Sequence, residues 1–149
     1  MTETTTNLQV ETIINDVLGA IDREREREII SRRYGLFDRK ETLEQIGELL
    51  GITRERVRQL EKSVMAKLTA QAQKDLPHVA DFDAALVADL QTAGKVAKIS
   101  DISERMTEKN TKIDQSRVAF LARLAPSVTF VGENDHFHNA AALAADFPK

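Results

Sequence analysis

Apolar residues recur at helical spacing along the N-terminal half of this chain, with polar residues between them. The pattern predicts a helix from about Leu8 to Ala20, and a second helix that Asp22 caps and that reaches Tyr34, before Gly35. The first helix carries an apolar stripe, formed by Val10, Ile13, Ile14, Val17, Leu18 and Ile21. Such a stripe is typical of the core of a helical bundle.

Two further helical patterns meet at Gly51. Thr42 can cap the first of them, with Gln45 at the reciprocal position of a capping box. Gly51 suits the left-handed residue that ends a helix, and Thr53 can cap the helix that follows. The inner faces are Leu43, Ile46, Leu49 and Leu50, then Val57, Leu60, Val64 and Leu68. A short helix, a short turn with glycine and a longer helix predict a helix-turn-helix.

The polar side of the longer helix begins with Arg54, Glu55, Arg56, Arg58 and Gln59. Arginine can bond both guanine acceptors in the major groove, glutamate can accept from cytosine, and glutamine can pair with adenine. The first turns of a recognition helix are the part that meets base edges. The alternative is a solvated, charged face of a bundle helix.

The stretch TLEQIGELLGITRERVRQLEKSVMAKL, at 42–68, resembles region 4 of housekeeping-type bacterial sigma factors, and REREREIISRRYGL before it resembles the preceding helix of that family. The match runs from about Asp22 to Leu68, and the domain that it implies covers about residues 8–72. The order of its residues is much richer than that of a generic helix-turn-helix.

The resemblance implies contact with the minus-35 element of promoters. On the family's pattern, the base-reading residues are Arg54, Glu55, Arg58 and Gln59. The DNA phosphates would be contacted by Arg25, Arg33, Thr42, Thr53, Arg56 and Lys62. The sequence departs from the family where Ser63, Ala66 and Thr69 stand in place of further basic residues, which weakens the phosphate contact.

The resemblance also implies a protein partner, the flap of the RNA polymerase β subunit. Part of the stripe from Val10 to Ile21 would then hold a partner helix in a groove. Sigma factors that open promoters carry further domains, and the short segment before the first helix leaves no room for them. We therefore expect something other than a complete initiation factor.

The break at Leu76-Pro77-His78 predicts two domains, at residues 1–75 and 76–149. The second half predicts three helices, a hairpin and a last short helix. The three helices are expected at Phe82–Ala93, capped by Asp81, at Ser100–Met106, capped by Ser100, and at Asp114–Leu124, capped by Asp114. The hairpin arms are expected at Val128–Val131 and His136–Asn139, and the last helix at Ala140–Ala145. The segment Val96–Ile99 can form a small strand. The fold class is thus mainly α, a helix-turn-helix domain plus a small winged-helix-like domain with one β-hairpin.

This layout, from Val79 to about Leu143, resembles the winged-helix domain of the RNA polymerase δ subunit. Only Arg117 and Arg123 are basic in its candidate recognition helix. A protein-binding or spacer role is therefore favoured over DNA reading for this half.

Charge is distributed unevenly along the 149 residues, whose net charge is −3. The segment from Thr53 to Lys74 is +4, so the remainder is −7. Basic charge concentrated on one helix is what a localised phosphate-facing surface needs. The chain has no cysteine and no apolar run of membrane-spanning length, which fits a cytoplasmic protein.

We find no motif for catalysis, and expect no enzyme activity, cofactor or metal. His136 and His138 share a face if Phe137 lies in a strand, with Glu133 and Asp135 nearby, but a solvated hairpin is the better interpretation.

Three functions remain open. The protein is a regulator that reads minus-35-like DNA, a polymerase-binding adaptor or decoy that reads no sequence, or a structural, self-associating module. The first is the one we expect.

Overall fold

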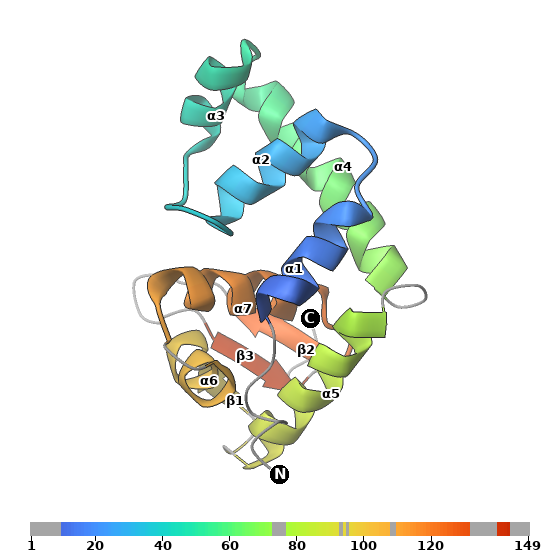
Figure 1. Ribbon diagram of the computed structural model, residues 1–149, viewed down its shortest axis with the longest axis vertical. Helices are drawn as coiled ribbons and strands as arrows, with labels where there is room; N and C mark the ends of the chain where they lie inside the picture. The colour runs from blue at the N-terminus through green and yellow to red at the C-terminus, as the bar shows by residue number, and fades with distance from the viewer. Residues whose placement is uncertain are drawn as a thin grey trace.

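The computed structural model describes residues 10–72, 77–92, 94, 96–107, 110–131 and 140–143. Helices dominate, and a small sheet lies in the C-terminal half (Figure 1). The elements are α1 (Val10–Gly19), α2 (Glu24–Tyr34), α3 (Leu43–Leu50), α4 (Arg54–Ala72), α5 (Pro77–Thr92), β1 (Val96–Lys98), α6 (Ile99–Met106), α7 (Lys112–Leu124), β2 (Val128–Val131) and β3 (Ala140–Leu143).

The helix-turn-helix forms as the sequence predicts, except that Leu49, expected on the inner face of α3, is 55% exposed. The Thr42 hydroxyl accepts from the backbone N–H of Gln45 at 3.1 Å, and the Gln45 side chain accepts from the N–H of Thr42 at 2.9 Å. Gly51 ends α3 with φ of 74°, and the Thr53 hydroxyl caps α4 through the N–H of Arg56 at 3.1 Å. These local bonds satisfy backbone groups that a helix end leaves without partners.

A small apolar core holds this unit together. It consists of Ile29 from α2, Ile46 from α3, and Val57 and Leu60 from α4. Because these residues point inward, the opposite side of α4 is turned to solvent.

The C-terminal half has the element order helix, strand, helix, helix, strand, strand, which is the order of a winged helix. Its sheet is antiparallel with β3 in the middle, so that Lys98 pairs with Ala140 and Val128 with Leu143. The short strand expected near Val96 and the first hairpin arm, Val128–Val131, are confirmed. The expected turn and the second arm at 132–139 lie outside the described residues.

Several local predictions in the C-terminal half are wrong. Ala140–Leu143 is a strand rather than a helix, because it pairs on both sides with β1 and β2. Helix α5 begins at Pro77, five residues earlier than the expected Phe82, since proline is well accommodated at the first helical position.

Four predicted caps are also wrong. Asp81 lies inside α5, which begins at Pro77, so it does not cap that helix. Helix α2 has Arg23 as its N-cap in place of Asp22, and α6 has Lys98 in place of Ser100. Helix α7 begins one turn before the expected cap Asp114, because Thr111 caps it and Asp114 closes the capping box from the third helical position.

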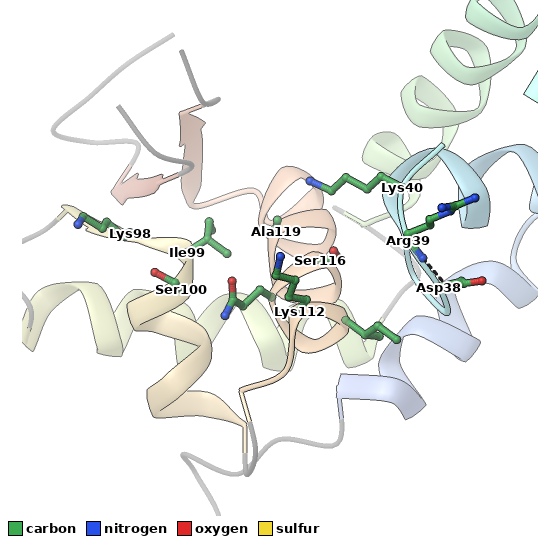
Figure 2. Close-up of a pocket in the computed structure, with 11 residues that line it drawn as sticks. Asp38, Arg39, Lys40, Lys98, Ile99, Ser100, Lys112, Ser116 and Ala119 are labelled. Carbon is green, nitrogen blue, oxygen red and sulfur yellow. Dashed lines mark hydrogen bonds between the residues drawn. The ribbon is translucent and has the colours of Figure 1, made fainter. Parts of the chain in front are cut away.

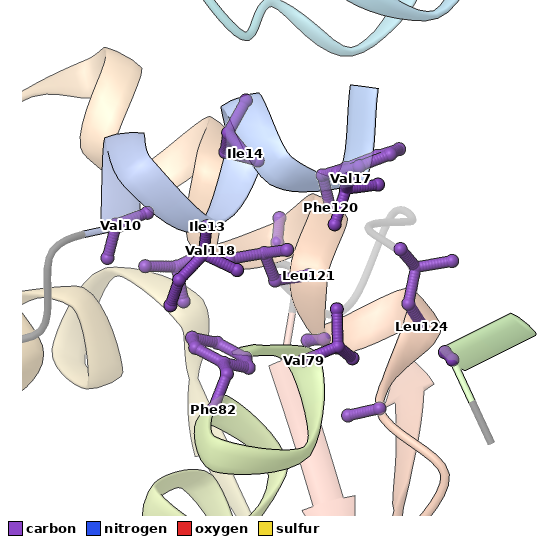
Figure 3. Packing of buried hydrophobic residues seen from close by; sticks show 14 of the residues in the cluster. Val10, Ile13, Ile14, Val17, Val79, Phe82, Val118, Phe120, Leu121 and Leu124 are labelled. Atoms are coloured by element: carbon purple, nitrogen blue, oxygen red, sulfur yellow. The ribbon is translucent and has the colours of Figure 1, made fainter. Parts of the chain in front are cut away.

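The largest apolar core draws on both halves of the chain (Figure 3). The stripe of α1 is buried, and it faces α7 and α5. The close-up places Ile13 and Val17 of α1 near Val118 and Phe120 of α7. The apolar face of α1 is therefore covered within the molecule, as its interpretation as core requires. The division at residues 1–75 and 76–149 stays a prediction.

No helix in the described ranges is both long enough and apolar enough to cross a membrane.

Candidate nucleic-acid interface

The first turns of α4 present a polar edge to solvent. Arg54, Glu55, Arg56, Arg58 and Gln59 are all exposed. The edge stands on a rigid support, because the opposite face of the same turns is packed into the small core of the helix-turn-helix. Exposure on a rigid helix is the geometry that a major groove requires. The assignment of individual residues to bases stays a prediction.

The side chains of this edge are already bonded to one another. Arg58 donates to Glu55 through two bonds, from Nε at 3.0 Å and from its terminal nitrogen at 2.6 Å. Arg56 donates to the side-chain oxygen of Gln59 at 3.4 Å, and Gln59 donates to Glu55 at 3.5 Å. A doubly hydrogen-bonded pair of this kind, called the Glu55–Arg58 fork below, limits the rotamers of both side chains. The edge is therefore partly ordered before any ligand arrives.

The pair also affects the titration of Glu55. Hydrogen bonding to Arg58 lowers the pKa of the Glu55 carboxyl, and Glu55 in turn raises the pKa of Arg58. A lowered carboxylate pKa means that the pair is complete above the ordinary pKa of glutamate and is lost as the pH falls through the folded-state value.

We therefore predict that the Glu55 carboxyl titrates at a lower pH in the native protein than in the variant Arg58→Ala. The titration is measured by carboxyl carbon NMR on the folded chain. Lys62→Ala removes a charge from the same helix without touching the pair, and serves as the control. Equal midpoints in the native protein and in Arg58→Ala would show that the fork does not form in solution.

The residues expected at phosphates have different surroundings. Thr42, Thr53, Lys62 and Arg25 are exposed, and the two threonines cap α3 and α4. Arg33 is engaged within the protein, because its Nε lies 3.5 Å from a Glu61 carboxylate oxygen and its terminal nitrogen donates to a backbone carbonyl at 3.3 Å. Among the phosphate candidates, Arg33 would therefore lose the most side-chain interactions within the protein if it bound DNA.

Sequence reasoning missed the role of Glu61. Its carboxylate accepts from the Tyr34 hydroxyl at 2.6 Å, which joins α4 to the end of α2. Burial, and then the bond to Glu61, raise the pKa of Tyr34, so the hydroxyl keeps its proton and remains a donor. No pattern in the sequence joins residues that lie 27 positions apart.

The two arginines of α7 contact the other half of the protein. Arg117 donates from Nε to the backbone carbonyl of Leu36 at 2.7 Å and lies over the Phe37 ring, 5.2 Å from its centroid. Arg123 lies over the Tyr34 ring at 5.4 Å. The candidate recognition helix of the C-terminal half thus uses both arginines in packing within the molecule.

In the described part of the chain, no three histidine, cysteine, aspartate or glutamate side chains are grouped as a metal site. His136 and His138 lie outside it.

Part of the N-terminal half matches a known protein family. The family described as Sigma-70, region 4 matches residues 23–70, which leaves α1 outside the matched range. The principal sigma factor HrdD of Streptomyces griseus is 41% identical over 73 residues, and the principal sigma factor HrdC of Streptomyces coelicolor is 52% identical over 52 residues. The sigma factor SigA1 of Synechococcus elongatus is 53% identical over 45 residues.

These matches cover 48%, 34% and 30% of this chain, and only 20%, 15% and 11% of the respective relatives. The chain thus spans a fifth or less of the length of these relatives. Region 4 of sigma factors is a helix-turn-helix that binds DNA, and the relatives are RNA polymerase sigma factors. Residues 23–70 therefore form a sigma-70 region 4 domain with homology to principal sigma factors.

Proposed function

We propose that this protein is a transcription regulator that binds minus-35-like promoter DNA through α4. The observation that carries the proposal is the exposed edge from Arg54 to Gln59, held outward on a helix-turn-helix that matches region 4. Charge, hydrogen-bonding groups and exposure coincide there, on the part of a recognition helix that meets base edges.

The chemistry of the edge divides into base and phosphate contacts. Arg54, Arg58, Glu55 and Gln59 offer donors and acceptors that discriminate between base pairs. To read bases, the Glu55 and Arg58 side chains either form bonds to bases in addition to their mutual hydrogen bonds or replace the mutual bonds. Because the pair is already ordered in the free protein, less side-chain entropy is lost on binding DNA.

Phosphate contacts set the position of the protein on the duplex. Arg56 and Lys62 of α4, Arg25 and Arg33 of α2, and the caps Thr42 and Thr53 are the proposed donors. So few contacts give an affinity that is modest and falls with rising salt.

Arg54→Ala is expected to weaken binding to the preferred duplex by about 1–3 kcal/mol and to relax the preference at one base position. Lys62→Ala is expected to weaken binding to all sequences alike and to reduce the salt slope by about 1, because it removes a phosphate contact only. The measurement is a fluorescence anisotropy titration with a minus-35-like duplex and a scrambled duplex at several salt concentrations.

Unchanged binding by both variants at low salt would remove DNA reading by α4 as the function. Ser63→Ala is a suitable control, since Ser63 is an exposed uncharged residue of the same helix.

Contact with RNA polymerase is the second part of the proposal, since region 4 contacts both promoter DNA and polymerase in sigma factors. In the resemblance, the β flap binds the apolar surface of the first helices. Here that stripe of α1 is buried against α7 and α5, so binding of the flap there requires α1 to separate from α7. An adaptor or decoy that reads no DNA depends wholly on that surface, so we rank it below DNA binding. The C-terminal half would act as an accessory of the kind that the δ-subunit resemblance suggests.

A further inference from the structure

An open cleft lies between the α2–α3 loop and the C-terminal half (Figure 2). Its volume is about 760 Å³. Four basic side chains line it, from three separate places in the chain: Arg39 and Lys40 from the loop, Lys98 at the end of β1, and Lys112 at the start of α7. Asp38 is the acidic residue of the lining.

Within the described residues, none of the four cations forms an ion pair. Two of the nearby carboxylates, Glu41 and Asp114, are engaged elsewhere, and Asp38 leaves the described lining with a net charge of +3. Asp38 accepts from the backbone N–H of Arg39 at 2.8 Å, Glu41 pairs with Arg32 at 2.8 Å, and Asp114 is held in the capping box of α7. Four like charges around one cleft repel each other, and an anion bound among them relieves that repulsion.

The rest of the lining suits phosphate oxygens. Ser100, Ser116 and Gln115 supply hydrogen-bond donors, and the first turn of α6 has no side-chain cap. Asp101, also in that turn, does not line the cleft. Among the described residues of the lining, none is aromatic and able to stack on a base. The lining is therefore suited to the phosphates of a nucleic acid rather than to its bases.

We propose that this cleft binds the phosphate backbone of duplex DNA that extends beyond the helix-turn-helix, a proposal that rests on DNA binding by α4. Lys40 is two residues before Thr42, the cap of α3, so the cleft continues from the helix-turn-helix itself. The C-terminal half thereby adds sequence-independent contacts, which compensates for the basic residues that α4 lacks at Ser63, Ala66 and Thr69.

The test compares the native chain with the double variant Lys98→Gln/Lys112→Gln, and uses Lys98→Arg/Lys112→Arg as the charge-conserving control. Both lysines are exposed, so the fold tolerates their replacement. Binding is measured by anisotropy across a salt series, on duplexes of about 12 and about 30 base pairs, roughly one and three helical turns, that carry the same minus-35-like element.

We expect the native chain and the arginine control to bind the longer duplex more tightly and with the steeper salt slope. The glutamine variant should bind both duplexes with similar affinity. The slope of its log binding constant against log salt concentration should be lower by about 2 on the longer duplex and unchanged on the shorter one. An unchanged glutamine variant, or one weakened equally on both duplexes, overturns the proposal.

The two proposals can fail separately. If the lysines make binding of the longer duplex tighter but the minus-35-like element is not preferred, the cleft proposal is supported and base reading by α4 is rejected. A preference for that element without an effect of the lysines rejects the cleft alone, and absence of binding to either duplex rejects both. Inorganic tripolyphosphate is the small probe: lysine-dependent binding of tripolyphosphate without an effect of duplex length overturns the assignment to DNA.

Discussion

Phe120→Ala is expected to lower the free energy of unfolding by about 3–5 kcal/mol, the usual cost of emptying a fully buried aromatic site. Phe120 of α7 has no exposed surface, and its ring centroid lies 5.2 Å from that of Tyr34 in α2. It belongs to the core to which α1, α2 and α4 also contribute. The loss should therefore destabilise both halves in one transition.

Denaturant unfolding followed by circular dichroism gives the free energy, and hydrogen exchange shows which helices open. Leu49→Ala is the matched control, because Leu49 is 55% exposed and its removal should change stability by no more than about 0.5 kcal/mol. If the amides of α3 and the first turns of α4 keep their protection while only the C-terminal half unfolds, the two halves are independent.

Gly47→Ala is expected to cost about 3 kcal/mol of stability, at the upper end of the range for overpacking, and to abolish preference for one DNA sequence. Gly47 is buried in α3, and a Cβ there would lie 2.6 Å from the backbone oxygen of Ile52. A backbone oxygen cannot rotate away as a side chain can. The turn before α4 must therefore shift, and the edge that begins at Arg54 shifts with it.

The measurements are thermal unfolding and anisotropy with the minus-35-like and scrambled duplexes. Gly19→Ala is the control, because a Cβ at Gly19 meets nothing within 4 Å, so stability and binding should be nearly unchanged. Full sequence preference in Gly47→Ala would mean that the close approach of the turn to α3 does not fix the position of α4.

Much of the N-terminal fold could be predicted because its determinants are local. The capping box of Thr42, the left-handed Gly51 and the cap Thr53 act within three or four residues, and each appears as expected. Apolar spacing likewise indicated the buried face of α4 and thereby the exposure of Arg54 and its neighbours.

Predictions failed where a choice between local signals depended on partners further away. Ala140–Leu143 has the composition of a helix, but it lies between β1 and β2 and completes both ladders. The cap of α7 was missed for a local reason, because Thr111 forms the cap and Asp114, which was expected as the cap, closes the capping box three residues later.

The helices up to Leu124, the helix-turn-helix and the residues of its polar edge could be predicted from residue types alone, since helical periodicity and capping operate over one or two turns. Long-range packing set three further features: α7 covers the stripe of α1, Arg117 bonds to Leu36 across 81 positions, and four described cations from three segments line one cleft. Such contacts depend on how helices pack against one another, and no local pattern of residue types encodes which distant surfaces meet.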